Sequence, residues 1–282
     1  MVSHTSGLVR DLDVLELLGT DEAFERGGYG VQDIALLTQR DKGQISRVCQ
    51  TLASSGLISR DPRTRKYTLG HRMFAIALRT REAHLANLAQ PFLLELVAQS
   101  EESAHLTVLR GGGVLTLRTE LSQHTLRDGS LSGVTLPALR TASGRAILAT
   151  FTDAELEAWW AEHGVFRNPP AEYPRQVEGA EIRRLRRQPG SIRSLSGLKR
   201  VVRGVRRAGY AVSVGELNAG IVDAAAAVID ASGRAVAAIA VGAIRERIGD
   251  RFEAMGEAVT RAALLLADAL DPQEAGGLTD TD

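Results

Sequence analysis

Cysteine, aromatic residues and long hydrophobic runs are scarce in this chain of 282 residues. The single cysteine, Cys49, excludes an internal disulfide and a metal cluster held by several thiolates, which is typical of proteins from a reducing cytoplasm. The six histidines show no HxxxH or HExxH spacing, so we expect neither a metal site nor a cofactor. No apolar run reaches the ~18 residues of a membrane-spanning helix, and residues 1–11 lack the apolar stretch of a secretory signal. We therefore expect a cytoplasmic protein.

Catalytic motifs are missing as well. The chain has no GxSxG, GxxxxGK(S/T) or GxGxxG motif, and Cys49 has no histidine at a useful spacing. Acidic pairs such as Glu101 and Glu102 adjoin each other on segments that read as exposed. We therefore predict that the chain is not an enzyme.

The formal net charge is zero, which at first argues against a nucleic-acid partner. The charges are unevenly distributed, however. Residues 1–37 hold two basic and seven acidic side chains, a balance of −5, whereas residues 38–72 hold eight basic and two acidic ones, a balance of +6. One small domain would then carry faces of opposite sign, and the Debye length of ~8 Å lets the basic face act locally.

The pattern in residues 41–56 predicts an amphipathic helix whose apolar positions recur at i, i+3, i+4 and i+7: Ile45, Val48, Cys49 and Leu52. Gly56 is expected just beyond its end. The opposite face is short, polar and singly basic, a composition suited to touching base edges in a DNA groove. A basic hairpin follows, with strands at residues 57–59 and 66–69 around a turn at residues 61–64. A recognition helix followed by such a wing predicts a DNA-binding winged helix-turn-helix.

The other periodicities predict an α+β fold with an antiparallel sheet flanked by helices. In the first domain we expect helices at residues 8–19 and 31–38, separated by a loop at residues 20–30. Further on we expect a helix restarting near Pro91, a hairpin around Gly111–Gly113, helices within residues 143–163, 180–188 and 198–209, two strands joined by residues 230–233, and a helix over residues 250–269. The expected divisions are residues 1–70 (winged helix-turn-helix), 71–90 (linker helix), 91–270 (a mixed α/β domain) and 271–282 (a disordered tail).

Three motifs carry a resemblance to a known family. ISRVCQTLASSGLI precedes a wing that ends in KYTLG, LPALRTASGRAILA follows in the middle of the chain, and GYAVSVGEL leads into DASGRAVAAIAVG. In this order and spacing, from about Leu8 to about Leu270, the chain resembles the IclR family of bacterial transcriptional regulators. The resemblance implies a GAF-like effector-binding domain behind the DNA-binding domain. It also implies dimers, or dimers of dimers, on double-stranded operator DNA.

The resemblance places a set of residues at the DNA. Arg47 is the sharpest candidate because a guanidinium can donate twice to guanine; a phosphate contact or a solvated position is the equal alternative. For the wing, contact with the DNA backbone is the favoured interpretation. Cys49 could be a redox switch, but its place on the apolar face favours a small core residue. The expected DNA-binding residues are Lys42, Gly43, Gln44, Ser46, Arg47, Gln50, Arg63, Arg65 and Lys66.

A second set would line the effector site: Leu136, Ala142, Ser143, Ser213, Ile221, Asp223, Ala240 and Gly242, with Glu216 nearby. Thr141 and Ser143 stand where a helix begins and could bind an anion, although plain N-capping explains them too. Relatives that bind small oxo-acids tend to have an acid in place of Ser213, a cysteine in place of Asp223 and serines in place of Ala240 and Gly242. These departures predict a bulkier, aromatic effector with an N–H or O–H donor rather than glyoxylate or pyruvate. Asp223 could instead point out of the pocket.

The function expected from these residues is ligand-responsive regulation of transcription, with repression of catabolic genes ranked first. An activator of the same class, or a small-molecule sensor without its own DNA reading, is the alternative. The arginine-rich stretch at residues 183–207 could be a second nucleic-acid patch, but a solvated helix face is the favoured interpretation. Trp159 and Trp160 are interpreted as packing or subunit-contact residues.

Overall fold

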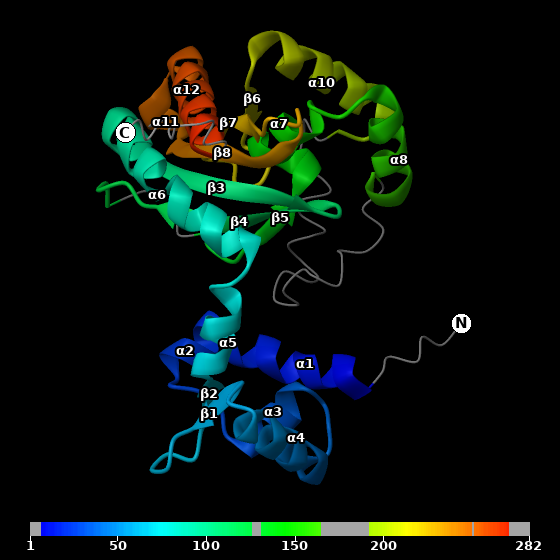
Figure 1. The fold of residues 1–282 in the computed structure, drawn as a ribbon, viewed down its shortest axis with the longest axis vertical. Coiled ribbons are helices and arrows are strands. Elements are labelled where there is room, and N and C mark those ends of the chain that lie inside the picture. The colour runs from blue at the N-terminus through cyan, green and yellow to red at the C-terminus, as the bar shows by residue number, and fades with distance from the viewer. Residues whose placement is uncertain (1–6, 126–130, 165–191, 250, 271–282) are drawn as a thin grey trace, which may run out of the picture. The chain divides into compact units, whose positions relative to one another are not determined.

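The computed structural model describes residues 7–125, 131–164, 192–249 and 251–270 (Figure 1). The chain divides into two compact units, Met1–His84 and Leu85–Asp282. The helix expected at residues 180–188, part of the arginine-rich stretch and the tail at residues 271–282 lie outside the described residues. Within the described residues, no helix is both long and apolar enough to cross a membrane.

The first unit is a small helical core with a two-stranded hairpin. Its fully buried side chains include Val14, Ile34, Ile45 and Cys49, one or more from each of the longer helices, together with Ile58 of the hairpin. The elements are α1 (Gly7–Leu18), α2 (Asp21–Glu25), α3 (Val31–Leu37), α4 (Lys42–Ser54), β1 (Ile58–Arg60), β2 (Tyr67–Leu69) and α5 (His71–Ala77). The predicted helices and hairpin of this unit are confirmed.

The loop expected at residues 20–30 was wrong in part, because it contains the short helix α2. Thr20 caps this helix by accepting a hydrogen bond from the Ala23 amide at 3.1 Å. Asp21 and Glu22 lie in its first turn, where negative charge is favourable. Ala23 is buried against the core of the unit. A local cap and one buried alanine therefore suffice for a turn and a half of helix.

Gly28 lets the chain return close to the hairpin. Its φ is +95°, and a Cβ atom there would lie 2.2 Å from the Tyr67 carbonyl oxygen. The next residue, Tyr29, exchanges two backbone hydrogen bonds with Tyr67, at 3.1 and 2.8 Å. A side chain at position 28 would therefore prevent this third extended segment from pairing with β2.

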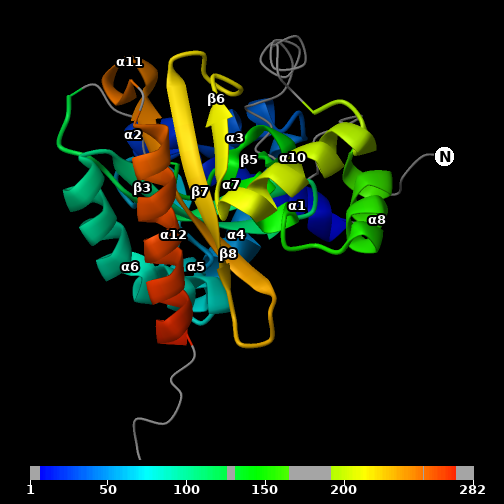
Figure 2. The same ribbon diagram turned by 90° about the horizontal axis from the view of Figure 1, so that it is seen from above.

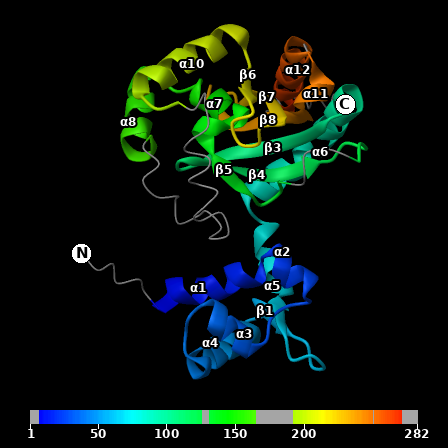
Figure 3. The same cartoon turned by 180° about the vertical axis from the view of Figure 1, so that it is seen from behind.

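The second unit is built on one antiparallel sheet of six strands in the order β5-β4-β3-β8-β7-β6 (Figures 1 and 3). The predicted α+β class is confirmed, as are the hairpins β3–β4 and β7–β8. Its strands are β3 (Ser103–Arg110), β4 (Gly113–Glu120), β5 (Thr135–Pro137), β6 (Ala211–Val214), β7 (Ile221–Ile229) and β8 (Ala235–Ile244). Its helices are α6 (Arg81–Ser100), η1 (Ala138–Arg140), α7 (Ala142–Leu148), α8 (Asp153–His163), α10 (Leu195–Ala208), α11 (Arg245–Ile248) and α12 (Phe252–Leu270).

The two faces of this sheet carry different side chains because residues alternate along each strand. On one face, large apolar residues such as Leu106, Ile239 and Val241 pack with residues of α6 and α12. On the other face, small residues such as Ala225 and Ala238 pack with residues of α7, α8 and α10. Figure 2 shows α6 and α12 on one side of β7 and the other three helices on the opposite side. The smaller side chains of the second face leave room beside α7.

The predicted helix from residue 71 onward has different bounds. α5 ends at Ala77, and α6 begins at Arg81, where the Thr80 hydroxyl accepts a hydrogen bond from the Ala83 amide at 3.2 Å. We expected a restart near Pro91, but Pro91 lies inside α6. Leu85 and Leu93, on either side of it, are buried in the core with α12 and the sheet. This burial outweighs the hydrogen bond that a proline cannot donate.

Two leucines of α12 give a matched test of the core. Leu266 is fully buried, whereas Leu264, two positions earlier on the same helix, is 63% exposed. We expect Leu266→Ala to lower the free energy of unfolding by about 2–5 kcal/mol, since it removes packed methyl groups and leaves a cavity. Leu264→Ala should change it by less than ~0.5 kcal/mol. Urea unfolding followed by the fluorescence of Trp159 and Trp160, both in the second unit, measures the difference; equal losses would contradict the assigned core.

Candidate nucleic-acid interface and ligand cavity

The N-terminal half of α4 presents most of the residues expected at DNA to solvent. Asp41 caps the helix by accepting a hydrogen bond from the Gln44 amide at 2.9 Å. Ile45 and Cys49 turn inward and are fully buried. Exposed on the outer face are Lys42, Gly43, Gln44, Arg47 and Gln50, with Ser46 half-buried beside them.

Arg47 is free to meet a partner, whereas its neighbour Arg40 is not. Within the described residues, the Arg47 guanidinium makes no hydrogen bond or ion pair. Arg40 donates to Asp11 at 2.8 Å, to the Arg10 carbonyl at 2.7 Å and to Gln44 at 3.4 Å. Arg40 thus fixes the beginning of α4 against α1. This contact and the buried side chains of α4 hold the helix that carries Arg47.

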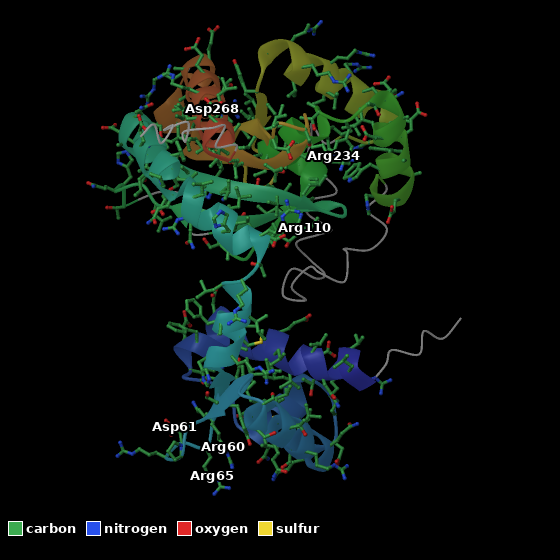
Figure 4. All side chains as sticks on the ribbon, viewed as in Figure 1. Arg60, Asp61, Arg65, Arg110, Arg234 and Asp268 are labelled. Carbon is green, nitrogen blue, oxygen red and sulfur yellow. The ribbon has the colours of Figure 1, made fainter. Side chains whose placement is uncertain are left out.

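The tip of the wing is a turn closed by Asp61. One carboxylate oxygen of Asp61 accepts hydrogen bonds from the amides of Arg63 and Thr64, both at 2.7 Å. These two donors hold the pKa of the Asp61 carboxyl below its usual range. Arg63 and Arg65 are exposed, and Figure 4 shows Arg60, Asp61 and Arg65 together at this tip. The acid therefore orders the turn while the cations around it face solvent.

Lys66 differs from the other residues expected in the wing. Its Nζ donates to the Arg26 carbonyl at 2.6 Å, and its side chain is half-buried. Arg60 lies over the Tyr67 ring, with its guanidinium carbon 5.2 Å from the ring centroid. Both cations brace the hairpin, which leaves Arg63 and Arg65 as the cations least engaged with the protein.

Cys49 is buried in the first core, as the apolar pattern predicted. Burial raises the pKa of its thiol to about 11, because a thiolate is poorly solvated there. At neutral pH the reactive thiolate is therefore rare, which favours the core interpretation over a redox switch.

The second unit holds a cavity of about 290 Å³ on the sheet face that carries α7. Strands β3, β4, β5, β7 and β8 supply one wall, and the start of α7 and the loop after β6 supply the other. The lining residues are His105, Thr107, Val114, Thr116, Leu131, Leu136, Thr141, Ala142, Ser143, Glu216, Leu217, Asn218, Ile221, Asp223 and Ala240.

Most residues expected in the effector site lie on this lining, including Leu136, Ala142, Ser143, Ile221, Asp223 and Ala240. The alternative orientation of Asp223 does not hold, because Ile221 and Asp223 share the cavity face. Ser213 does not line the cavity: its hydroxyl donates to the Arg140 carbonyl at 3.1 Å. Gly242 does not line it either. It has no side chain to reach the cavity, and it pairs with Ser103 and Asp223 across the sheet.

The sequence analysis did not predict that the hairpin β3–β4 contributes to the cavity. His105 and Thr107 of β3 and Val114 and Thr116 of β4 line the cavity, as do Leu131, Leu217 and Asn218. The alternation in β3 was a usable signal, since His105 and Thr107 separate the apolar Ala104, Leu106 and Val108. It places two polar side chains on one face of the strand and three apolar ones on the other.

Thr141 acts as a helix cap, which was the plainer of its two interpretations. Its hydroxyl accepts from the Gly144 amide at 3.1 Å and lies 3.3 Å from the Ala138 carbonyl, to which it can donate. A Cβ atom on Gly144 would lie 2.2 Å from that same carbonyl oxygen. A glycine is therefore needed for α7 to pack this closely against η1.

A buried cluster of two arginines and one glutamate holds the cavity wall. Arg145 on α7 and Glu216 in the loop after β6 form an ion pair at 2.5 Å, with side chains 6% and 8% exposed. Arg145 also donates to the carbonyls of Leu139 and Val212, at 3.0 and 3.2 Å. Arg140 donates to the Glu216 carbonyl at 3.1 and 2.6 Å. Burial lowers the pKa of Arg140, and the charge of Glu216 opposes that shift.

One carboxylate oxygen of this cluster has no hydrogen-bond partner among the described residues. Glu216 Oε1 accepts from Arg145, but Oε2 is buried and has no hydrogen-bond partner among the described residues. The same residues contain no group of three or more histidine, cysteine or acidic side chains that could hold a metal ion. A cavity of this size, with mostly apolar walls and a few polar groups, suits a small organic molecule.

Comparison with known proteins identifies what the chain resembles. Residues 78–267 match the family described as bacterial transcriptional regulator IclR, C-terminal. The HTH-type transcriptional regulator BhcR of Paracoccus denitrificans is 26% identical over 96% of this chain and 89% of its own. The p-hydroxybenzoate hydroxylase transcriptional activator of Acinetobacter baylyi is 27% identical over 84% and 80%. An IclR homolog complexed with 4-hydroxybenzoate from Microbacterium hydrocarbonoxydans has a similar fold, with a TM-score of 0.75, 22% identity, and coverage of 94% and 99%.

The ion pair of the cavity wall can be tested by removing its two charges separately and together. Arg145→Met should lower the free energy of unfolding by about 3 kcal/mol, because it leaves the carboxylate of Glu216 buried without its main partner. The double variant Arg145→Met/Glu216→Met should recover most of this loss. Urea unfolding followed by tryptophan fluorescence gives both values. A double variant as unstable as Arg145→Met would show that the pair itself, not the unpaired charge, sets the stability.

Proposed function

The chain belongs to the IclR family of bacterial transcriptional regulators, and we propose that its first unit binds operator DNA while the cavity of the second unit binds the controlling effector. Ligand-responsive regulation of transcription is the function of the family. For this chain we propose repression of catabolic genes in the cytoplasm, relieved by the effector, with no catalytic role. The naming of one relative as an activator supports activation as the second candidate.

The observation that carries the DNA-binding proposal is the set of exposed cations on α4 and the wing. Lys42, Arg47, Arg63 and Arg65 are exposed and form no ion pair with any residue that the structure describes. Lys42 and Arg47 lie on α4, and Arg63 and Arg65 lie on the wing, whereas the acids of this unit are concentrated in residues 1–37. Exposed cations without acidic partners favour a polyanionic partner, and an exposed helix face suits the major groove.

The residues of this face would have different tasks. We assign base reading to Arg47, with Lys42, Gly43, Gln44, Ser46 and Gln50 beside it on α4. Arg63 and Arg65 would contact phosphates, because such contacts position a protein on the duplex rather than read its sequence. Lys66 would contribute mainly by bracing the hairpin, since its amine is already bonded to the Arg26 carbonyl.

The effector we propose is an aromatic compound with a single ring. The cavity volume of about 290 Å³ and its apolar residues, such as Val114, Leu136 and Ile221, suit a ring better than a two-carbon or three-carbon acid. A structural relative was crystallised with 4-hydroxybenzoate, which supports an effector of that size. Ala240, in place of a larger or hydroxylated side chain, adds to this room.

Communication between the two sites would proceed through α6 and a change in dimer geometry. α6 begins at Arg81, next to the boundary between the units, and packs along the sheet that forms the cavity. We propose a homodimer, or a dimer of dimers, in which effector and operator each favour one arrangement of the subunits.

Three arginine variants distinguish the loss of base reading from the loss of a positive charge that contacts phosphate. Once an operator has been selected from random duplex DNA, Arg47→Ala should weaken binding to it by roughly tenfold to a hundredfold and relax its sequence preference. Arg63→Ala should weaken binding to all sequences alike and lower the slope of log affinity against log salt by about one. Fluorescence anisotropy at several salt concentrations measures both effects.

Arg10→Ala is the matched control, since Arg10 is an exposed arginine of the same unit outside the proposed face. It should leave operator affinity within about twofold of the wild type, a difference below ~0.5 kcal/mol. If the wild-type chain selects no DNA sequence while a ligand still binds in its cavity, the chain is a sensor without DNA reading. If Arg10→Ala and Arg47→Ala have equal effects, α4 is not the reading element.

The size of the effector can be tested with a ligand panel on the full chain. Calorimetric titration with single-ring aromatic compounds should give measurable binding, whereas glyoxylate and pyruvate should bind at least tenfold more weakly because they leave most of the apolar wall uncovered. Ala240→Leu, which fills the cavity, should abolish binding of the ring. Tight binding of the short oxo-acids alone would contradict the proposal.

A further inference from the structure

Helix α10 has an apolar face and, on its opposite side, a face of arginines. Its buried residues Leu198, Val202 and Val205 pack with residues of α7 and α8, which lie beside it in Figure 2. The opposite side carries three exposed residues, which we call the arginine face of α10: Arg200, Arg203 and Arg207. Because these positions are three and four apart on a helix, their side chains are neighbours on one surface.

The acids next to α10 are bound to other cations of the helix. Lys199 lies 3.4 Å from Asp153 and 2.7 Å from Glu157, both on α8. Arg206 lies 3.7 Å from Asp153 and donates to the Ala149 carbonyl at 2.9 Å. In the part of the chain that the structure describes, the guanidinium groups of the arginine face make no hydrogen bond or ion pair. The acids of α8 therefore neutralise one flank of α10 and leave the arginine face charged.

The sequence around this face adds further positive charge. Residues 165–209 hold twelve basic and three acidic side chains, a balance of +9 that exceeds the +6 of residues 38–72. Residues 192–209, which include α10, hold no acid at all. Like charges three and four positions apart on a helix repel one another, and a polyanion bound across them removes that repulsion.

Duplex DNA fits this face better than the acidic residues 1–37 of a second copy of the chain. Two acids of that stretch already bind cations of their own unit, Asp11 with Arg40 and Glu22 with Arg26, both at 2.8 Å. Duplex DNA instead carries one negative charge per ~1.7 Å of its axis. A chain whose first unit is bound to DNA also keeps the duplex at a high local concentration around its second unit.

We propose that the arginine face of α10 binds phosphates of duplex DNA outside the site that α4 reads. The face spans ~10 Å of helix, and a duplex carries roughly six phosphates over that length, so each guanidinium has one within reach. Contacts of this kind strengthen binding without reading the sequence. The inference rests on the proposed binding of operator DNA by the first unit, because that binding brings the duplex to the second unit.

Two lengths of duplex separate this contact from operator recognition. The variant Arg200→Gln/Arg203→Gln/Arg207→Gln is compared with the wild-type full chain by fluorescence anisotropy at several salt concentrations. One probe is the selected operator alone, and the other is the same operator with about 40 further base pairs, roughly 140 Å of added duplex. On the long probe the variant should lower the slope of log affinity against log salt by about two to three and weaken binding roughly tenfold or more. On the short probe it should match the wild type.

Two matched variants serve as controls. Arg234→Gln/Arg245→Gln/Arg261→Gln removes the same net charge from exposed arginines of other elements in the second unit, and it should leave both affinities within about twofold of the wild type. Lysine at all three positions of the arginine face retains the charge and should restore binding of the long probe, because an ammonium group also binds phosphate.

An unchanged slope on the long probe, or an equal loss in the control variant, would overturn the inference. So would a glutamine variant that dissociates into smaller oligomers in analytical ultracentrifugation while keeping its affinity for the long probe, since the face would then bind a second copy. If the triple variant loses the thermal unfolding transition of the wild type, the three single glutamine variants replace it, and each should lower the slope by about one. Binding of the short probe tests the proposed function by itself, so a failure of this inference alone leaves that binding intact.

Discussion

The ion pair between Arg145 and Glu216 is the interaction on which the second unit most depends, because it joins segments 71 positions apart in the chain. Arg145 lies on α7 and Glu216 in the loop after β6, so the pair closes the helix against the edge of the sheet. A buried pair is stable only if its geometry is complete, and the carbonyls of Leu139 and Val212 complete that of Arg145. The pair thereby holds together the start of α7 and the loop after β6, which both line the cavity.

The cavity itself results from a difference in side-chain size between the two faces of the sheet. Toward α6 and α12 the central strands present large residues such as Leu106 and Ile239, which fill the space against those helices. Toward α7 they present Thr107 and Ala240, which cannot fill it. Because protein interiors are otherwise closely packed, the volume of this cavity is left where small residues meet the start of a short helix.

Elements set by local chemistry could be predicted from the sequence, and those set by distant contacts could not. The start of α8, where Thr152 and Glu155 form a capping box, and the hairpin turn at residues 230–233, closed by Asp230, were predictable because each depends on neighbours within a few positions. The path of α6 through Pro91 was not, since the packing of its apolar face decides it. Nor was the inward turn of Ser213 toward the Arg140 carbonyl, 73 positions away. Residue spacing predicts faces of helices and strands; it does not predict which faces meet.

This distinction explains why the two sites differ in how far the sequence determines them. The proposed DNA-binding face is carried by one helix and one hairpin within about thirty positions, so its cations and its buried apolar residues can be recognised together. The cavity gathers residues from His105 to Ala240, and its chemistry depends on which acid is neutralised by which arginine. A family resemblance transfers the positions of such a site. The charge that a ligand meets there depends on this chain's own pairing, because Arg145 compensates Glu216 from outside the lining.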